Sequence, residues 1–368
     1  MKIVYLFKLA LLSALSLFLV SCASIEEESK DSTEPIRVSI SQSPQEAIAG
    51  IELPEGYHLE LVLAEPHIEE PVLSVFDGNG RMFVAEMRTY MQDGDSTGEF
   101  EPSSRVSMHE DTTGDGQYDR HTIFADNLLL PRIVLPLDDR VIIGETNTLD
   151  LYSYRDTNGD GVSDEKLLWF EGGPRGGNLE HQPNGLIWAQ DNWLYTTYND
   201  YRLRFTNGAV EKQTIPQNGG QWGITQDDNG KVWFVDAGGE RGPIFFQQHI
   251  PYGTFSIDGE EADDYRVVWP TDSIPDTQGG RFQLRDNNTL NHFTATCGQD
   301  IFRGDRLPED LRGDLLFAEP VGRLIRRTKI TVNDGITRLE NAYDQSEFLR
   351  TKDPLFRPVN MTTAPDGT

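Results

Sequence analysis

One strand-turn-strand pattern recurs along the chain, and it constrains the fold more than any other feature of the sequence. Each copy has a polar or proline-containing lead-in, an apolar strand, a turn of Gly, Asp or Asn, and a second strand that ends near an acid or a threonine. Such turn residues tolerate the positive φ angles of tight hairpins, and the flanking runs are alternating, β-branched or aromatic. The copies occupy residues 69–86, 129–146, 181–198, 219–237, 297–319 and 356–368.

This repeat predicts an all-β fold, a six-bladed β-propeller. A single blade cannot bury both of its faces, whereas blades packed radially share one core and leave no long exposed edge. A β-sandwich is the alternative, because similar hairpins occur there, but the repeated lead-in favours the propeller. The sixth copy stops within its turn at "APDGT", so we expect a last blade that is truncated in this chain.

The composition limits the possible partners. The 368 residues include 60 acidic and 32 basic side chains, which gives a formal net charge of −28. Such a chain repels nucleic acid and anionic membrane surfaces and attracts cations. Hydrophobic residues make up 37% of the chain, which suffices for a packed core. We therefore expect a folded protein that does not bind nucleic acid.

The N-terminus reads as a targeting signal. Lys2 and Lys8 precede an apolar run that ends in "LVSC", at Cys22. This ending resembles a lipobox, which implies cleavage before Cys22 and lipid attachment there; an ordinary signal peptide is the alternative. Ala23 carries no aspartate retention signal for the inner membrane. We therefore expect an outer-membrane lipoprotein that faces the periplasm or the cell surface, attached to the membrane by its lipid only.

These features divide the chain into three segments. Residues 1–21 are the predicted signal peptide, residues 22–50 a flexible acidic tether, and residues 51–368 the propeller domain. If Cys22 carries lipid, Cys297 is the one thiol left, so no intrachain disulfide is possible. We expect Cys297 to be a buried packing thiol. The sequence has no C-x-x-C-H motif, so this chain attaches no haem covalently.

Two acidic loops, residues 111–119 and 156–164, share the plan Asp-Thr-x-Gly-Asp-Gly. Oxygen-bearing residues at alternating positions, with a glycine for the sharp turn, suit calcium. Neither loop has the bidentate Glu of an EF-hand, and a solvated acidic hairpin tip is the alternative. The predicted ligands are Asp111, Thr113, Asp115, Gln117 and Asp119 in the first loop, and Asp156, Asn158, Asp160, Val162 and Asp164 in the second, with Gln117 and Val162 binding through carbonyls.

The triplet Glu180-His181-Gln182 stands immediately before the first strand of the third copy. In a propeller the lead-ins cluster at one end of the central channel, where small-molecule sites are usually built. A histidine beside a carboxylate can act as a general base near neutral pH. A surface histidine in a loop, or one that caps a strand end, is the alternative.

The stretch "EHQPNGLIWAQDNWLYTTYND" resembles a segment of the soluble quinoprotein glucose dehydrogenases and their aldose and sorbosone dehydrogenase relatives. Those enzymes read Asp-His-Gln-x-Gly-Arg-Leu, two short strands, and Thr-x-Gly-Asp. The resemblance implies that His181 takes the alcohol proton as hydride moves to pyrroloquinoline quinone, that Glu180 orients His181, and that Gln182 belongs to the same catalytic site. The matching positions are Glu180, His181, Gln182, Leu186, Asn199 and Asp200.

A longer resemblance covers residues 50–368. The chain is similar to membrane-bound dehydrogenase propellers, which are often fused downstream to helical repeats and a C-x-x-C-H cytochrome domain. This resemblance implies that electrons pass to a cytochrome domain or partner. The stretches that carry it are "GYHLELVLAEPHIEEPV", "GNGRMFVAEM", the two acidic loops, "CGQDIFRGDRLPEDLRGDLLFAEP" and "EFLRTKDPLFRPVNMTTAPDG".

One stretch departs from the quinoprotein pattern. Where those enzymes carry Arg-Asn-Pro, which contacts the quinone, this chain has Gly219 and Gly220 in "NGGQWGI". Neither glycine neutralises a cofactor carboxylate, and the pair would instead leave space for a substrate to approach the backbone. Other sources of positive charge are Arg281, Arg303, Arg323 and Arg326.

The sequence thus predicts a sugar or polyol dehydrogenase-like lipoprotein. Oxidation would be assisted by His181, and electrons would pass to a quinone and then to a cytochrome. The alternative is a non-catalytic propeller, anchored to the outer membrane, that binds a glycan or a protein. A third possibility is a hydrolase or lyase that uses His181 with calcium.

Overall fold

The structure, a computed structural model, describes residues 42–216, 220, 222–236, 242–246, 259–277 and 280–368. The predicted signal peptide, the predicted lipidation site Cys22 and Gly219 lie outside these residues. In the described part of the chain, no helix is long and apolar enough to cross a membrane. All of the sheets belong to the unit that runs from Ser41 to Thr368.

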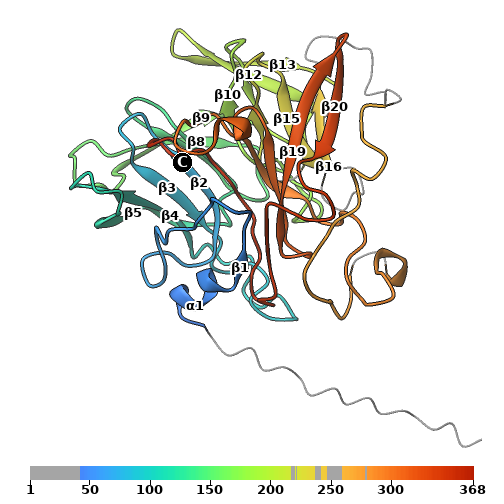
Figure 1. The fold of residues 1–368 in the computed structure, drawn as a ribbon. Coiled ribbons are helices and arrows are strands. Elements are labelled where there is room, and N and C mark those ends of the chain that lie inside the picture. Colours follow the sequence, from blue (N-terminus) through green and yellow to red (C-terminus); the bar gives the residue numbers. More distant parts are fainter. Residues whose placement is uncertain (1–41, 217–219, 221, 237–241, 247–258, 278–279) are drawn as a thin grey trace, which may run out of the picture. The chain divides into compact units, whose positions relative to one another are not determined.

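The described residues form five sheets of antiparallel strands, each built mainly from strands consecutive in the chain (Figure 1). The first comprises β2 (Pro71–Phe76), β3 (Met82–Glu86), β4 (Ser104–Glu110) and β5 (Arg120–Leu128). The second comprises β6 (Ile133–Pro136), β7 (Val141–Gly144), β8 (Leu151–Arg155) and β9 (Glu165–Phe170). The third comprises β10 (Ile187–Trp188), β11 (Leu194–Tyr195), β12 (Tyr201–Thr206) and β13 (Ala209–Thr214).

The last two sheets complete the set. The fourth comprises β14 (Thr225–Gln226), β15 (Val232–Asp236) and β16 (Gly242–Phe246). The fifth comprises β17 (Cys297–Ile301), β18 (Leu315–Glu319), β19 (Leu324–Asn333), β20 (Ile336–Asn341), β21 (Leu349–Thr351) and the N-terminal β1 (Ile51–Glu52). Two short 3-10 helices, Arg281–Gln283 and Glu309–Leu311, lie in the connections.

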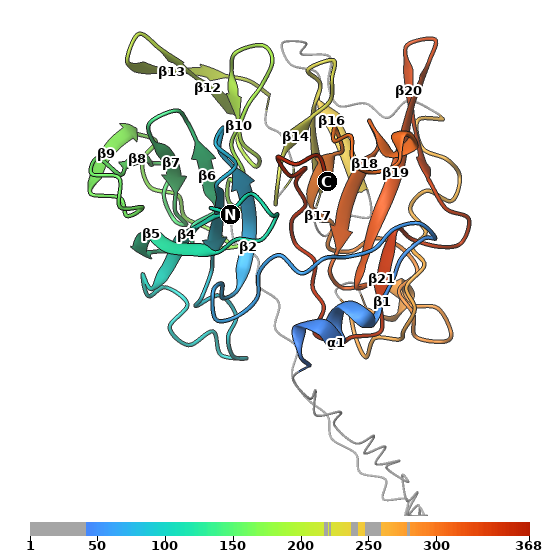
Figure 2. The same cartoon turned by 60° about the vertical axis from the view of Figure 1, so that its left-hand side comes forward.

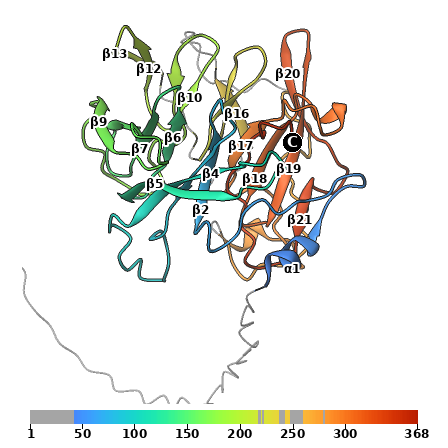
Figure 3. The ribbon, with the colours of Figure 1, turned by 90° about the vertical axis from the view of Figure 1, so that its left-hand side faces the viewer.

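One edge strand of every sheet lines a central cavity of about 200 Å³; the lining residues come from β2, β6, β10, β14 and β17 and from residues 360–362. Figure 2 and Figure 3 show the sheets arranged around this centre, with β2 beside β6 and β14 beside β17. The fold is therefore all-β and propeller-like, as the repeat predicts. Five of the six predicted hairpins are confirmed, because β2–β3, β6–β7, β10–β11, β14–β15 and β17–β18 each fall within one copy.

The prediction of six blades is wrong for the described residues, because the sixth copy forms no strand. Residues 356–368 instead bond to both the first and the fifth sheet. The Met361 N–H donates to the Gly298 carbonyl (2.9 Å), and the Ser74 N–H donates to Asn360 Oδ1 (3.0 Å). One of these acceptors is a side chain, and the two bonds go to different sheets. They therefore do not build the continuous backbone ladder of a strand.

Each pair of neighbouring sheets encloses one apolar cluster. Strand β7 shows how the sequence produces this packing. Val141 and Ile143 pack into the cluster shared with the first sheet, whereas Ile142 packs into the cluster shared with the third. Successive residues of a strand point to opposite faces. A continuously apolar strand therefore fills the space on both sides of its sheet, as radial packing requires.

In four of the five sheets, a polar side chain at the end of the second strand or just after it fixes the lead-in of its own sheet. The sequence repeat shows these positions as an acid or a threonine, and in the structure each accepts a hydrogen bond from a lead-in backbone N–H. The bond satisfies a backbone donor that enters no β-ladder. The pairs are Glu86 with Glu69 (2.7 Å), Glu145 with Leu129 (2.6 Å), Thr197 with Asn184 (3.1 Å) and Glu319 with Thr294 (2.8 Å).

Regular structure begins at residue 44, within the segment that the sequence predicts to be a flexible tether. Helix α1 (Pro44–Ala49) begins after Ser43, which forms a capping box with Glu46. Strand β1 follows and pairs with β21, with Ile51 opposite Thr351. The predicted flexible tether therefore does not extend to residue 50, because its last residues form a capped helix.

Candidate functional site

The lead-in end of the propeller is the end at which β6, β10 and β14 begin, preceded by Arg132, Asn184 and Gly223. Asn184 joins these three lead-ins. Its buried amide Nδ2 donates to the Arg132 carbonyl (3.0 Å), and its Oδ1 accepts from the Gly223 N–H (2.6 Å). The relative positions of three sheets at this end therefore depend on one amide side chain.

Gln182, the third member of the predicted triplet, is buried and pairs with Asn147. Its Oε1 accepts from the Asn147 N–H (2.7 Å), and its Nε2 donates to Asn147 Oδ1 (2.9 Å). Both ends of the amide thus hold the loop that follows β7. The structure gives Gln182 a positioning role, and its contact with a substrate stays a prediction.

His181 is exposed at the lead-in end, and its ring lies against Tyr198. The two ring centroids are 5.5 Å apart, with an interplanar angle of 27°. Arg175 supports both residues, because its Nη2 donates to the His181 carbonyl (3.0 Å) and its guanidinium lies 5.7 Å from the Tyr198 ring centroid. The imidazole is therefore held on one face while it remains open to solvent.

Glu180 does not orient His181 as the resemblance implies. Its carboxylate accepts a hydrogen bond from the Tyr90 hydroxyl (3.3 Å), and among the described residues no hydrogen bond joins the side chains of Glu180 and His181. Burial, followed by the charge of Glu180, raises the pKa of Tyr90 to about 12. The phenol therefore keeps its proton at neutral pH and can donate it to Glu180.

Arg132, which the sequence reasoning missed, lies behind the triplet. It is 2% exposed, and its Nη1 donates to the Leu179 carbonyl (2.7 Å) and to Thr146 Oγ1 (3.4 Å). The guanidinium lies 4.9 Å from the Trp222 ring centroid. Burial lowers its pKa to about 10, so it stays charged at neutral pH. No sequence signal marks it, because burial is decided by the tertiary structure.

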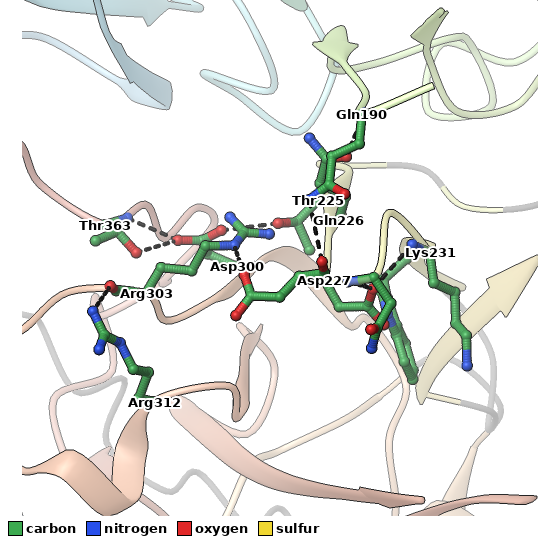
Figure 4. Close-up of polar contacts among 12 residues, drawn as sticks. Gln190, Thr225, Gln226, Asp227, Lys231, Asp300, Arg303, Arg312 and Thr363 are labelled. Carbon is green, nitrogen blue, oxygen red and sulfur yellow. Dashed lines mark hydrogen bonds and ion pairs between the residues drawn. The ribbon is translucent and has the colours of Figure 1, made fainter. Parts of the chain in front are cut away.

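One carboxylate, Asp300, is among the residues that line the central cavity, and Figure 4 shows its polar contacts. Its Oδ1 accepts from the Thr225 hydroxyl (2.9 Å), and its Oδ2 accepts from the backbone N–H and the hydroxyl of Thr363 (2.8 Å each). Burial raises the pKa of Asp300 above its ordinary value. This carboxylate ties β14 and β17 to the C-terminal segment and has an evident structural role.

Polar contacts also join the sheets around the far ends of β14 and β17 (Figure 4). Arg303 Nε donates to Asp228 (3.2 Å), and Arg312 donates to the Arg303 carbonyl (3.2 Å). The Gln190 N–H donates to Gln226 Oε1 (3.0 Å). These contacts link the fourth sheet to its neighbours on both sides.

The arginines that the sequence offers as sources of positive charge each lie near an acidic or amide side chain. Arg326 is buried in an ion pair with Glu347, Arg323 lies 3.8 Å from Asp272, Arg303 pairs with Asp228, and Arg281 donates to Asn288 (3.4 Å).

Gly220 does not open space for a substrate. Its φ is +77°, and a Cβ built on it would lie 2.9 Å from Phe234 Cδ2. Glycine is needed here because the backbone is left-handed and a phenyl ring packs directly against it. The expectation that this glycine lets a substrate approach is therefore wrong, whereas Gly219 lies outside the described residues.

The buried state of Cys297 agrees with its predicted packing role. The thiol is free and 4% exposed, and burial raises its pKa far above the ordinary value. A thiolate is the reactive form of cysteine. Cys297 therefore has no nucleophilic character at neutral pH.

The two acidic loops have matching internal hydrogen bonds. In each loop the first aspartate accepts from the N–H groups of two glycines, and the last aspartate accepts from the threonine at the second position. Nowhere in the described ranges are three or more His, Cys, Asp or Glu residues grouped so as to hold a metal ion, and calcium stays a prediction. The matching glycine bonds are Asp111 with Gly114 (2.6 Å) and Gly116 (2.8 Å), and Asp156 with Gly159 (2.7 Å) and Gly161 (2.7 Å).

The second acidic loop packs onto the first sheet. The Ser163 N–H donates to the Phe124 carbonyl of β5 (2.9 Å), and a Cβ on Gly161 would lie 3.0 Å from Met108 Cε. A Cβ on Gly116, the matching glycine of the first loop, would meet nothing within 4 Å. The two loops thus share a conformation but differ in packing.

Similarity to solved structures is weak and concerns the fold. The PQQ domain of a pyranose dehydrogenase from Coprinopsis cinerea has 13% identity and a TM-score of 0.49, over 86% of this chain and 92% of that one. An oxidoreductase described as a glucose dehydrogenase, from Thermus thermophilus, has 17% identity and a TM-score of 0.47, over 82% and 89%. A 6-phosphogluconolactonase from Bacteroides uniformis has 13% identity and a TM-score of 0.37, over 75% and 71%. Because these scores lie below 0.5, we base no conclusion about activity on them.

Sequence comparison gives a family but no described activity. No curated protein matches the chain. A family model covers residues 43–368, which include all five sheets and the lead-in end. The chain therefore belongs to the family described as a domain of unknown function, DUF7133.

Proposed function

We propose that the protein oxidises a hydroxyl group of a sugar or polyol at the lead-in end, with His181 as the proton acceptor. The observation that carries this proposal is the exposed His181 ring, held against Tyr198 while Arg175 fixes its backbone carbonyl. A neutral imidazole accepts a proton near neutral pH. An aromatic face beside it suits the apolar face of a sugar ring.

The oxidation needs an electron acceptor, and we assign this role to a quinone cofactor. When bound, the quinone would accept the hydride, and the electrons would then pass to a cytochrome c domain or partner. Arg132 fits an acidic group on such a cofactor, because two of its buried nitrogens have no hydrogen-bond partner. Of the arginines proposed from the sequence, Arg303, Arg323 and Arg326 each have a carboxylate within 4 Å, and Arg281 is exposed, so none is buried without an acid as Arg132 is.

The decisive experiment measures dye-linked turnover by the purified full-length protein. The protein is incubated with pyrroloquinoline quinone and calcium, and dye reduction is followed with a panel of aldoses and polyols. We expect His181→Ala to lower kcat by about a hundredfold or more, the usual contribution of a general base. The matched control is His58→Ala, another exposed histidine, which pairs with Glu60. Unchanged turnover in His181→Ala would refute the proposed role of His181.

A non-catalytic propeller that binds a glycan is the second candidate. It is favoured by the position of Glu180, which accepts from Tyr90 and so lacks the expected orienting contact with His181. In this case the wild-type protein binds a glycan on an array, and the binding falls in Tyr198→Ala, while no sugar gives dye reduction.

The predicted calcium loops belong to the same proposal as structural elements. On calcium binding, the carboxylates of Asp111 and Asp156 would bind the cation in place of the backbone N–H groups that now donate to them. Calorimetric titration with calcium, repeated on Asp111→Ala and Asp156→Ala, assigns binding to one loop, to both or to neither. If the heat of calcium binding is the same in the double variant as in the wild type, both loops are excluded as calcium sites.

The location of the protein is proposed from Cys22 alone. A lipid on Cys22 would attach the propeller to the outer membrane, facing the periplasm or the cell surface. Labelled palmitate should enter the wild-type protein and not Cys22→Ser. Equal labelling of the two proteins would rule out the lipid anchor at this residue.

A further inference from the structure

Arg132 differs from the other buried arginines in having no acidic partner. The described residues contain five buried arginines, and four of them lie within 4 Å of a carboxylate. The hydrogen bonds of Arg132 go only to two uncharged oxygens, those of Leu179 and Thr146. The four paired arginines are Arg202 with Asp191, Arg323 with Asp272, Arg326 with Glu347 and Arg327 with Asp314.

The unused atoms of Arg132 form one edge of the guanidinium. Nε and Nη2 are buried and make no hydrogen bond, whereas Nη1 makes both of the bonds described above. The Nε–Nη2 edge presents two parallel N–H groups, which is the geometry that binds a carboxylate through both of its oxygens. An unpaired buried charge is costly, and an anion bound at this edge would offset the cost.

A second cation lies near this edge. Burial lowers the pKa of Arg132, Tyr90 raises it, and the nearby charge of Arg175 lowers it further. The Trp222 ring covers the guanidinium face, and Trp222 itself is partly exposed. The backbone of Leu179, which Arg132 holds, leads directly into Glu180 and His181. Two guanidinium groups therefore lie near the predicted base, together with the Glu180 carboxylate and the Tyr90 hydroxyl, in a protein whose formal net charge is −28.

We propose that the Nε–Nη2 edge of Arg132 is the anchor of a carboxylate-binding site beside His181. The site would take a small carboxylate anion, supplied either by an acidic sugar or by the acid groups of a quinone cofactor. This proposal rests on the proposed function, because it names the charge of the molecule that the same site takes. It predicts that sugar acids bind better than the neutral sugars of the same size.

The test is a binding titration of the full chain that does not depend on turnover. Glucuronate, gluconate, pyrroloquinoline quinone and neutral glucose are titrated separately, with calorimetry and tryptophan fluorescence as readouts. We expect Arg132→Met to weaken binding of the carboxylates by about tenfold or more, as loss of a charged hydrogen-bond pair does. Arg132→Lys keeps the charge but loses the paired edge, so it should also weaken binding. Trp222→Phe should remove the fluorescence change.

The matched control is Arg120→Met, which removes the same charge at an exposed ion pair with Glu110 on the first sheet. Binding should be unchanged in this variant. Equal affinity of the wild-type protein and Arg132→Met for the anions, or no binding of any of them by the wild type, would overturn the proposal. If Arg132→Met fails to fold, Arg132→Lys decides the outcome, because retained affinity in that variant also contradicts the use of a paired edge.

The titrations also separate the sources of the carboxylate. Binding of glucuronate or gluconate in the absence of quinone identifies an acidic sugar, whereas binding of quinone alone identifies the cofactor. The two proposals fail in different ways. Carboxylates that bind through Arg132 without any dye reduction refute the dehydrogenase and keep this site. Turnover of neutral sugars, together with equal affinity of the wild type and Arg132→Met for every carboxylate, keeps the dehydrogenase and refutes this site.

Discussion

His181 and Tyr198 lie face to face across two segments of the third sheet, with their ring centroids 5.5 Å apart. His181 belongs to the lead-in before β10, and Tyr198 follows β11 with a φ of +56°. Arg175 contacts both residues, through the His181 carbonyl and the Tyr198 ring. The position of the exposed imidazole therefore depends on an aromatic contact and not on a neighbouring carboxylate.

Removing this contact should impair the site without unfolding the protein. We expect Tyr198→Ala to lower kcat/KM in the dye assay by about tenfold, because a misplaced base reacts slowly. Tyr198→Phe keeps the ring and should stay within about twofold of the wild type, since stacking does not need the hydroxyl. Steady-state kinetics on the three proteins checks this. Equal losses in the two variants would instead assign a role to the hydroxyl.

Asn184 should be important for stability, because it bonds to two neighbouring lead-ins. In Asn184→Ala the Gly223 N–H loses its partner and the Arg132 carbonyl keeps only the Gly185 N–H, which should lower the free energy of unfolding by about 1–3 kcal/mol. Asn333→Ala, at an exposed position of β19, should change it by less than about 0.5 kcal/mol. Urea unfolding measures both values. A small effect at Asn184 would mean that other contacts align the sheets.

Acid should destabilise the protein through His109. Burial, followed by the charges of His121, His67 and Arg105, lowers the pKa of His109 to about 4. In the unfolded chain its pKa is about 6.5, so the unfolded state binds the extra proton first as the pH falls. The stabilisation is thus complete above pH ~6.5 and is lost between about pH 6.5 and 4, by up to ~3 kcal/mol.

The comparison of His109→Gln with the wild type isolates this effect. Urea unfolding across the same pH window should show a flatter pH dependence in His109→Gln. His58→Gln, at an exposed histidine, should retain the wild-type slope. If His109→Gln also retains it, another titrating group controls the acid stability.

The two acidic loops provide a matched pair of glycines. Gly116 and Gly161 have φ angles of +87° and +89°, so alanine at either position should cost about 1–3 kcal/mol in backbone strain. Gly161→Ala should cost about 1 kcal/mol more, because its new methyl group would lie 3.0 Å from Met108 Cε and 3.1 Å from Thr122 Oγ1, so these side chains of the first sheet must shift. Thermal or urea unfolding compares the two variants. Equal losses would show that the second loop can shift away from the first sheet without cost.

Much of the fold could be predicted from local patterns in the sequence. Five hairpins stand where the turn residues and apolar runs place them, because a tight turn and strand alternation are local properties of the chain. The acid or threonine near the end of the second strand was visible too, although its role in holding a lead-in N–H in four of the sheets is seen only in the tertiary structure. The sixth copy shows the limit, since residues 356–368 have hairpin character but no ladder partner in the structure.

The candidate site was only partly visible in the sequence. The sequence by itself determined the repeated hairpin, the all-β class and the placement of Glu180, His181 and Gln182 at one end of the propeller. The tertiary structure alone decided that Gln182 is buried on Asn147, that Tyr90 and not His181 pairs with Glu180, and that Arg132 is buried without an acid. The physical reason is that turns and strand faces depend on neighbouring residues, whereas burial and charge pairing depend on segments that are far apart in the chain and meet only when the sheets pack.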